Sequence, residues 1–69
     1  MTQASDILNI SANANDAVER AEAITSNIDQ DWDHEATLYT FDDESVLLVS
    51  GPQLNAFADI ETARESLAD

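Results

Sequence analysis

The stretch that decides the fold is residues 36–49, which read Ala-Thr-Leu-Tyr-Thr-Phe-Asp-Asp-Glu-Ser-Val-Leu-Leu-Val. Residues 37–41 place β-branched and aromatic side chains at every second position, a pattern typical of a strand. Residues 42–44 are acidic and turn-forming. Residues 46–49 are apolar and supply the returning strand. This stretch therefore predicts an antiparallel hairpin.

The chain turns again after this hairpin, because Gly51-Pro52 interrupts regular structure. Residues 53–58 are long enough for a third short strand. Asp59 then stands at an N-cap position, and apolar residues follow at helical spacing as far as Leu67. Because residues 46–49 are apolar on both faces of their strand, we expect the last helix or a partner to cover the second face.

The segment before the hairpin is predicted to be one long helix. Ser5 can cap its start, and Asp6 lies in the first turn, where the helix dipole favours negative charge. Asn13–Asp16 leaves an alternative open, because this tract could cap a later, shorter helix and leave Ile7–Ile10 as an extended arm. The apolar stripe alternates spacings of three and four and consists of Ile7, Ile10, Ala14, Ala17, Ala21, Ile24 and Ile28.

These elements predict an α+β fold for residues 1–69 as a single small acidic domain. An N-terminal helix packs on a three-stranded antiparallel sheet, a meander, and a short C-terminal helix follows. Residues 29–35 are interpreted as a polar connection between the first helix and the sheet. The aromatic side chains are expected to pack in the core or at the sheet edge, namely Trp32, Tyr39 and Phe41.

The charge of the chain is strongly unbalanced. Fifteen Asp and Glu residues face only Arg20 and Arg64, which gives a formal net charge of −13. Seven of these acids fall within residues 29–44, whereas residues 45–58 carry no charge at all. Such a surface repels nucleic acid and anionic membranes and attracts basic partners. The sequence also shows neither a signal peptide nor an apolar stretch of about 20 residues, so we expect an intracellular, soluble protein.

The sequence offers no catalytic machinery and no cofactor site. There is no cysteine, which excludes disulfides and thiolate metal ligands. Nucleophile motifs and glycine-rich phosphate loops are absent, and the acids do not fit the spacing of a calcium-binding loop. His34, the one histidine, is expected to be exposed and solvated, since a single imidazole is no selective metal site. We therefore do not expect an enzyme.

The acidic cluster has three interpretations. It could serve solubility, or it could reflect adaptation to a salt-rich cytoplasm, although that adaptation would spread acids over the whole surface. The third interpretation is mimicry of nucleic acid. In an extended segment, residues two apart lie on one face about 6.5–7 Å apart, which is close to the separation of phosphates along a DNA strand. The acids with this spacing are Asp29, Asp31, Asp33 and Glu35.

Several tracts of the chain resemble a known family. In order they read Ala-Glu-Ala-Ile at 21–24, Asp-Gln-Asp-Trp-Asp at 29–33, Tyr-Thr-Phe-Asp-Asp-Glu-Ser-Val-Leu at 39–47 and Ser-Gly at 50–51. The chain is in this respect similar to small acidic phage-encoded anti-CRISPR proteins that inhibit the type I-F surveillance complex. The resemblance covers roughly residues 21–56. It implies a DNA mimic that binds the large subunit and backbone subunits of the effector, Cascade, along the path of target DNA.

The acids in the matching motifs are Asp29, Asp31, Asp33, Asp42 and Asp43. The relative continues into a longer acidic tail that this chain lacks, which leaves a type I-C target as open as a type I-F one. The leading hypothesis is a stoichiometric inhibitor that acts in the cytoplasm of the infected bacterial host. The candidate partner-binding residues are Asp29, Asp31, Asp33, Glu35, Asp42, Asp43 and Glu44.

Two other hypotheses remain. One is an acidic decoy of another kind, such as an inhibitor of a restriction or repair enzyme or an antitoxin-like binder of a basic partner. The other is a small housekeeping protein from a halophile. A pull-down from host lysate separates the first from a Cascade inhibitor, and a fold that forms only at molar salt would support the second.

Overall fold

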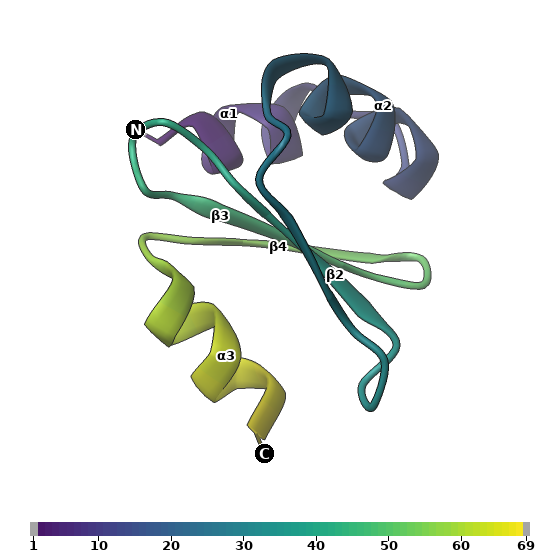
Figure 1. Cartoon of the computed structure of the whole chain (residues 1–69). Helices are drawn as coiled ribbons and strands as arrows, with labels where there is room; N and C mark the ends of the chain where they lie inside the picture. The colour runs from purple at the N-terminus through teal and green to yellow at the C-terminus, as the bar shows by residue number, and fades with distance from the viewer. Residues whose placement is uncertain (1, 69) are drawn as a thin grey trace.

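The computed structural model describes residues 2–68 and shows three layers, with two helices above an antiparallel sheet and one helix below it (Figure 1). The chain begins and ends in opposite layers. The elements in chain order are α1 (Gln3–Ile10), α2 (Ala14–Ile24), β1 (Ile28–Asp31), β2 (Ala36–Thr40), β3 (Val46–Ser50), β4 (Gln53–Phe57) and α3 (Ile60–Ala68).

The sheet is a meander with strand order β1-β2-β3-β4 and antiparallel pairing throughout. The hairpin predicted from residues 36–49 is confirmed as β2 and β3, in which Leu38 pairs with Leu48. The strand predicted at residues 53–58 is confirmed as β4. The expected count of three strands is wrong, because Ile28–Asp31 forms a fourth strand along β2. Ile28 was expected to end the helical stripe, and residues 29–31 were expected in the polar connection. This edge strand is largely exposed on both faces, so its sequence shows no apolar alternation.

The sheet separates two apolar clusters. On the upper face, Tyr39, Phe41 and Leu47 pack against buried residues of α1 and α2. On the lower face, Leu38 and Leu48 pack against α3. The returning strand β3 faces both clusters, which explains why it is apolar on both sides. The helix expected to cover its second face is confirmed as α3, and Asp59 caps it by accepting the Thr62 N–H at 2.8 Å.

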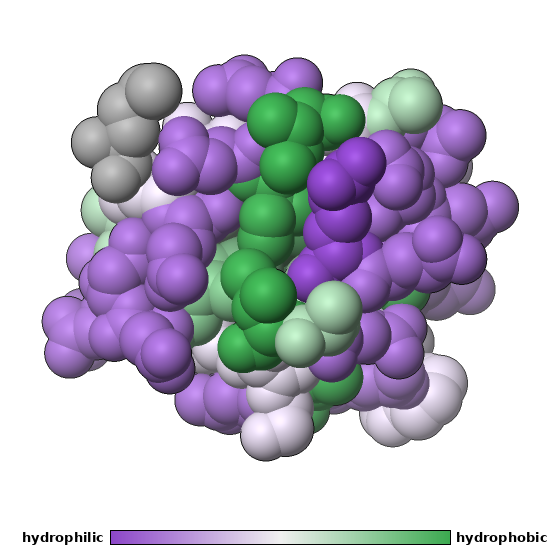
Figure 2. All heavy atoms as spheres, turned by 90° about the horizontal axis from the view of Figure 1, so that it is seen from above, coloured by the Kyte–Doolittle hydropathy of each residue, from purple (hydrophilic) through white to green (hydrophobic). Residues whose placement is uncertain are grey.

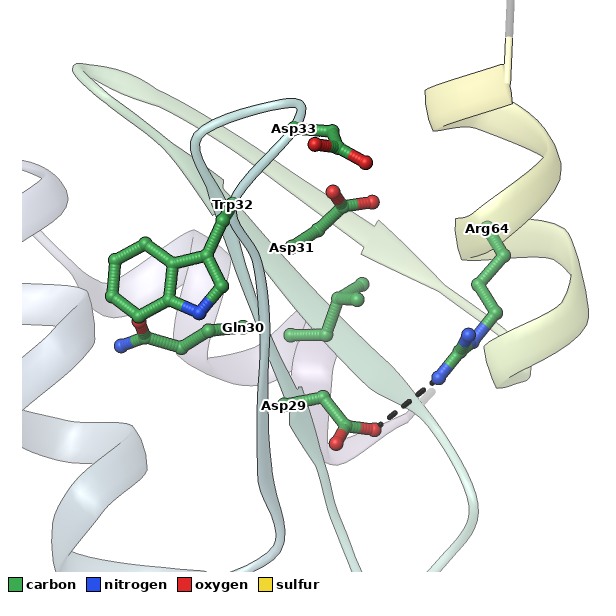
Figure 3. Close-up of a pocket in the computed structure, with 7 residues that line it drawn as sticks. Asp29, Gln30, Asp31, Trp32, Asp33 and Arg64 are labelled. Atoms are coloured by element: carbon green, nitrogen blue, oxygen red, sulfur yellow. Dashed lines mark hydrogen bonds and ion pairs between the residues drawn. The ribbon is translucent and has the colours of Figure 1, made fainter.

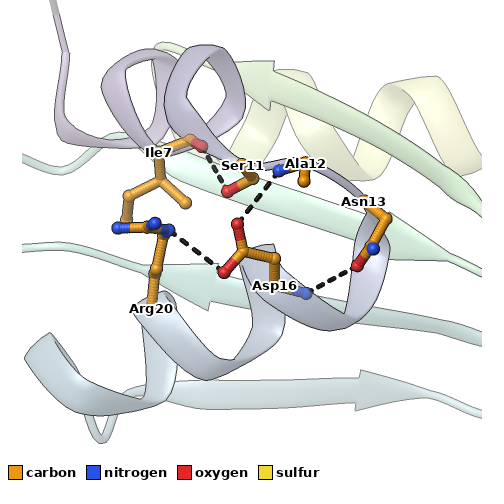
Figure 4. A network of polar contacts seen from close by, with 6 residues as sticks. All are labelled: Ile7, Ser11, Ala12, Asn13, Asp16 and Arg20. Carbon is orange, nitrogen blue, oxygen red and sulfur yellow. Dashed lines mark hydrogen bonds and ion pairs between the residues drawn. The ribbon is translucent and has the colours of Figure 1, made fainter.

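The predicted single N-terminal helix is instead two helices. Thr2 rather than Ser5 caps the first, since its hydroxyl accepts the Ser5 N–H at 3.1 Å. Asn13 caps the second by accepting the Asp16 N–H at 2.9 Å, as the alternative reading foresaw (Figure 4). Residues 7–10 are helical, however, so the extended arm considered with that alternative is wrong.

A short polar network holds the junction of the two helices (Figure 4). The carboxylate of Asp16 accepts the backbone N–H of Ala12 at 3.0 Å and lies 3.3 Å from the guanidinium of Arg20. The hydroxyl of Ser11 donates to the Ile7 carbonyl, which satisfies the end of α1. Residues 11–13 therefore form a defined corner, and this corner turns α2 back over the sheet.

Candidate partner-binding site

One group of candidate acids lies along the sheet edge at β1 and in the turn that follows it. Asp29 and Asp31 pair with Leu38 and Ala36 of β2, so their side chains lie on the face of the sheet that α3 covers. Asp33 follows in the turn and points to the same side (Figure 3). The three carboxylates border an open hollow of about 340 Å³. We call Asp29, Asp31, Asp33 and the neighbouring Glu35 the edge cluster.

The turn of residues 32–35 places the last two acids of this cluster. The carboxylate of Asp31 accepts the backbone N–H of His34 at 3.2 Å and contacts its Nδ1 at 2.9 Å. Hydrogen bonds from the His34 side chain and backbone lower the pKa of Asp31. Glu35 closes the turn with φ of 53° in the left-handed region. The expected extended row therefore ends at Asp31, and the remaining acids come from a turn.

The edge cluster contacts one cation of the same chain. A guanidinium nitrogen of Arg64 in α3 lies 3.4 Å from the carboxylate of Asp29 (Figure 3). Both side chains are more than half exposed to solvent. An ion pair of this length in water contributes little to stability, so Asp29 can exchange Arg64 for a cation of a partner at small cost.

His34 is half-exposed and adjoins the edge cluster rather than standing alone. Its side chain is 45% exposed, which agrees with the expected surface position, and it pairs with Asp31. Among residues 2–68, no group of three or more His, Cys, Asp or Glu side chains is arranged to hold a metal ion.

The second group of candidate acids, Asp42, Asp43 and Glu44, lies in the turn between β2 and β3. We call it the hairpin cluster. β2 joins the two turns, and its five residues at about 3.3 Å each span about 16–17 Å. The turns at residues 32–35 and 42–44 therefore lie at opposite ends of β2, with Asp29 beside Leu38 between them, whereas the sequence suggested one continuous surface.

Asp43 differs from its neighbours because its carboxylate is occupied within the fold. It accepts the N–H groups of Gln3 at 2.8 Å and Ser45 at 3.0 Å, and also the hydroxyl of Ser45. The fully buried Ser45 hydroxyl in turn accepts the Ala4 N–H at 3.1 Å. Two of the first N–H groups of α1 thus find acceptors in a turn about 40 residues away. Asp42 and Glu44 remain exposed.

Asp43 gives the stability of the protein a pH dependence. Hydrogen bonds from the Ser45 hydroxyl and the Gln3 N–H lower the pKa of this carboxyl group. A lowered pKa in the folded state means that the ionised form stabilises the fold, and that this contribution disappears as the pH falls through the folded-state pKa. We expect Asp43→Asn to destabilise the protein at about pH 6, and we expect the difference in unfolding free energy from wild type to narrow as the pH is lowered toward about 2.

Urea unfolding of both proteins across this pH range measures that difference. The other carboxyl groups are present in both proteins. The difference between the two unfolding free energies therefore reports on Asp43 alone. A difference in unfolding free energy that grows as the pH is lowered would contradict this assignment.

Trp32 contradicts the expectation that all three aromatic residues are packed. Tyr39 and Phe41 are 4% exposed and lie in the upper cluster, as predicted, but Trp32 is 81% exposed. It is the first residue of the turn after β1 and points away from Asp31 and Asp33 (Figure 3). The sequence does hold a local sign of this exposure. Trp32 is a single aromatic residue within the polar tract 29–35 and belongs to no periodic apolar face.

The helical layer carries an apolar groove between its two helices. Ile10 and Ile24 are 60% and 52% exposed and line it together with Arg20. Viewed from above, apolar side chains form a stripe bordered by polar ones (Figure 2). None of the helices within residues 2–68 has the length and apolar character needed to cross a bilayer.

Taken together, these features define a small acidic α+β protein that presents carboxylates at one sheet edge and can bind a cationic surface. Residues 7–68 match the family described as Anti-CRISPR protein AcrF2 protein. The chain therefore belongs to the AcrF2 family of phage anti-CRISPR proteins, of the type I-F kind, which confirms the resemblance seen in the sequence. No curated protein and no solved structure matches the chain. Membership makes it an inhibitor that binds CRISPR-Cas components in the infected host cell.

Proposed function

We propose that this protein inhibits a type I CRISPR effector complex, Cascade, by mimicking DNA and blocking the binding of target DNA. The observation that carries the proposal is the alignment of Asp29, Asp31 and Asp33 along one side of the sheet edge (Figure 3). The family supplies the inhibitory role, and the edge cluster supplies the groups that basic DNA-binding residues would recognise. The inhibitor acts in the cytoplasm of the bacterial host.

The spacing of the edge cluster supports mimicry of a phosphate row. Asp29 and Asp31 are two residues apart on one strand, which separates their side chains by about 6.5–7 Å. Phosphates along one DNA strand rise about 3.4 Å per nucleotide, and the helical path roughly doubles the distance between neighbours. Lysine and arginine side chains placed for such phosphates can therefore meet these carboxylates without rearrangement.

The overall charge supports rapid capture by a basic groove. The net charge is −13 and only two arginines oppose the acids. Opposite charges steer association and make its rate fall as salt is added. The hairpin cluster adds the exposed carboxylates of Asp42 and Glu44 beyond the other end of β2, and these can contact a second basic segment of the same groove.

A competition experiment tests this function. Purified type I-F and type I-C effector complexes are each mixed with labelled target duplex and increasing inhibitor, at several salt concentrations. We expect the inhibitor to displace the duplex from at least one complex, with a one-to-one stoichiometry and with an association rate that falls about tenfold or more between low and physiological salt.

The proposal would be contradicted if duplex and inhibitor bound the effector simultaneously and neither lowered the affinity of the other. Binding of the inhibitor to neither complex would also contradict it. Recovery of a nuclease or a repair enzyme from host lysate in place of Cascade subunits would then identify a different acidic decoy.

A further inference from the structure

The exposed side chain of Trp32 is not explained by mimicry of phosphates. An indole is among the largest apolar groups in a protein and usually buries about 150–250 Å² when it packs. Here it is 81% exposed at the start of a turn. Removing it from the fold would cost no core packing, since it belongs to neither apolar cluster. Exposed tryptophans that the fold does not need are common anchors of protein interfaces.

The surroundings of the indole indicate what it would bind. Trp32 and Glu35 line one open hollow of about 460 Å³, together with Gln30 and Thr37. Gln30 and Trp32 lie on the side of β1 away from the carboxylates of Asp31 and Asp33 (Figure 3). Glu35 makes no ion pair with any cation among residues 2–68. The hollow therefore combines an aromatic face with a carboxylate that has no partner within the described fold.

An arginine side chain fits this combination better than other groups. A cation placed over an indole is attracted by the negative face of the ring. The guanidinium group is planar, weakly hydrated and able to stack on an aromatic ring while donating hydrogen bonds to a carboxylate. A nucleobase would also stack, but its phosphates would be repelled by the edge cluster.

We propose that Trp32 is an anchor of the interface and stacks on an arginine of the effector, with Glu35 pairing the same guanidinium. This inference rests on the proposed function, because it takes the basic groove of a type I effector as the partner. It extends the contact surface around the sheet edge, so that Asp29, Asp31 and Asp33 bind cations on one side, and Trp32 with Glu35 binds an arginine on the other.

A substitution series at position 32 tests the anchor. Affinity for the effector complex is measured for Trp32→Phe, Trp32→Leu and Trp32→Ala. We expect the phenylalanine variant to bind within about threefold of wild type, and the leucine and alanine variants to bind about tenfold more weakly. The thermal unfolding midpoints should not change, because the side chain is exposed. Ile10→Ala is the matched control, since Ile10 is another exposed apolar residue and lies in the helical layer.

Chemical footprinting gives an independent readout. Trp32 is the only tryptophan of the chain, so oxidation of the indole by N-bromosuccinimide can be located by mass spectrometry. We expect protection of Trp32 in the complex and ready oxidation in the free protein.

Three results would contradict the proposal that Trp32 stacks on an arginine of the effector, while leaving DNA mimicry intact. These are an alanine variant that binds like wild type, an indole that stays reactive in the complex, and a leucine variant that binds like wild type, which would indicate an apolar socket. If the inhibitor and duplex bind together, mimicry fails, and the substitution series still decides the role of Trp32. If the wild-type chain binds no type I effector, both proposals fall.

Discussion

The triple variant D29N/D33N/E35Q is expected to bind a type I effector about 100-fold more weakly than the wild-type protein. Each exposed carboxylate contributes modestly at a wet rim, but Asp29 and Asp33 on one side of the sheet edge and Glu35 beside Trp32 on the other contact the same effector, so their losses combine. Most of the loss should come from slower association, because the edge cluster steers the encounter. Surface plasmon resonance at low and physiological salt separates the two rates. Asp31 is left unchanged because it holds the turn through His34.

The matched control is D6N/E19Q/E22Q, which removes the same number of charges from α1 and α2. These acids are exposed, as the edge-cluster acids are, but they belong to the helical layer. If binding depends on the position of the carboxylates, the control should bind within about threefold of wild type. An equal loss in both variants would show that net charge alone governs binding and would contradict a specific edge site.

Ser45→Ala is expected to lower the free energy of unfolding by about 1–3 kcal/mol. Ser45 is fully buried, and its hydroxyl accepts the Ala4 N–H while donating to Asp43. Removal of the hydroxyl leaves a buried N–H at the start of α1 without an acceptor. A chain of 69 residues has a total stability of only about 3–10 kcal/mol, so the loss is a large share. Urea denaturation measures it.

Ser26→Ala serves as the control for this variant, since Ser26 is exposed between α2 and β1. It should change stability by less than about 0.5 kcal/mol. Amide hydrogen exchange adds a local readout, because loss of the Ser45 hydroxyl should speed exchange in the first turn of α1. A Ser45→Ala variant as stable as Ser26→Ala would show that the hydrogen bond to Ala4 contributes nothing measurable.

The hairpin cluster shows why acids with similar sequence surroundings can have different roles. Asp42 and Asp43 are adjacent in the same turn and both are exposed, but only the carboxylate of Asp43 accepts an N–H of α1. Neutralising Asp43 would therefore weaken inhibition by loosening the fold, whatever it contacts in the partner. We propose Asp42 and Glu44 as the binding residues of this turn and Asp43 as the residue that positions them.

The sequence predicts the parts of the fold that bury apolar residues on a regular period. The hairpin at residues 36–49 and the helix after Asp59 follow from alternation, helical spacing and an N-cap. The strand Ile28–Asp31 has no such pattern, because it lies at the edge and is held by backbone pairing to β2. The break at residues 11–13 is obscured because apolar spacing continues across it, and only the cap at Asn13 marks it.

The candidate site is predictable in composition but not in arrangement. Charge counting identifies residues 29–44 as the acidic region, since ionised side chains must be near the surface. The division into two clusters follows from the extended strand Ala36–Thr40 between them, and counting charges along the sequence does not show this separation. The exposure of Trp32 is likewise a tertiary property, because aromatic residues are more often packed than exposed.

The position of β1 in the sheet order has a consequence for self-assembly. β1 is an edge strand, hydrogen-bonded to a neighbour on one side only. Proteins can aggregate by pairing such exposed edge strands. A second copy that docked its β1 against this β1 would bring aspartates against aspartates, at a Coulombic cost. The acids proposed to bind a basic groove thus also disfavour self-association through β1.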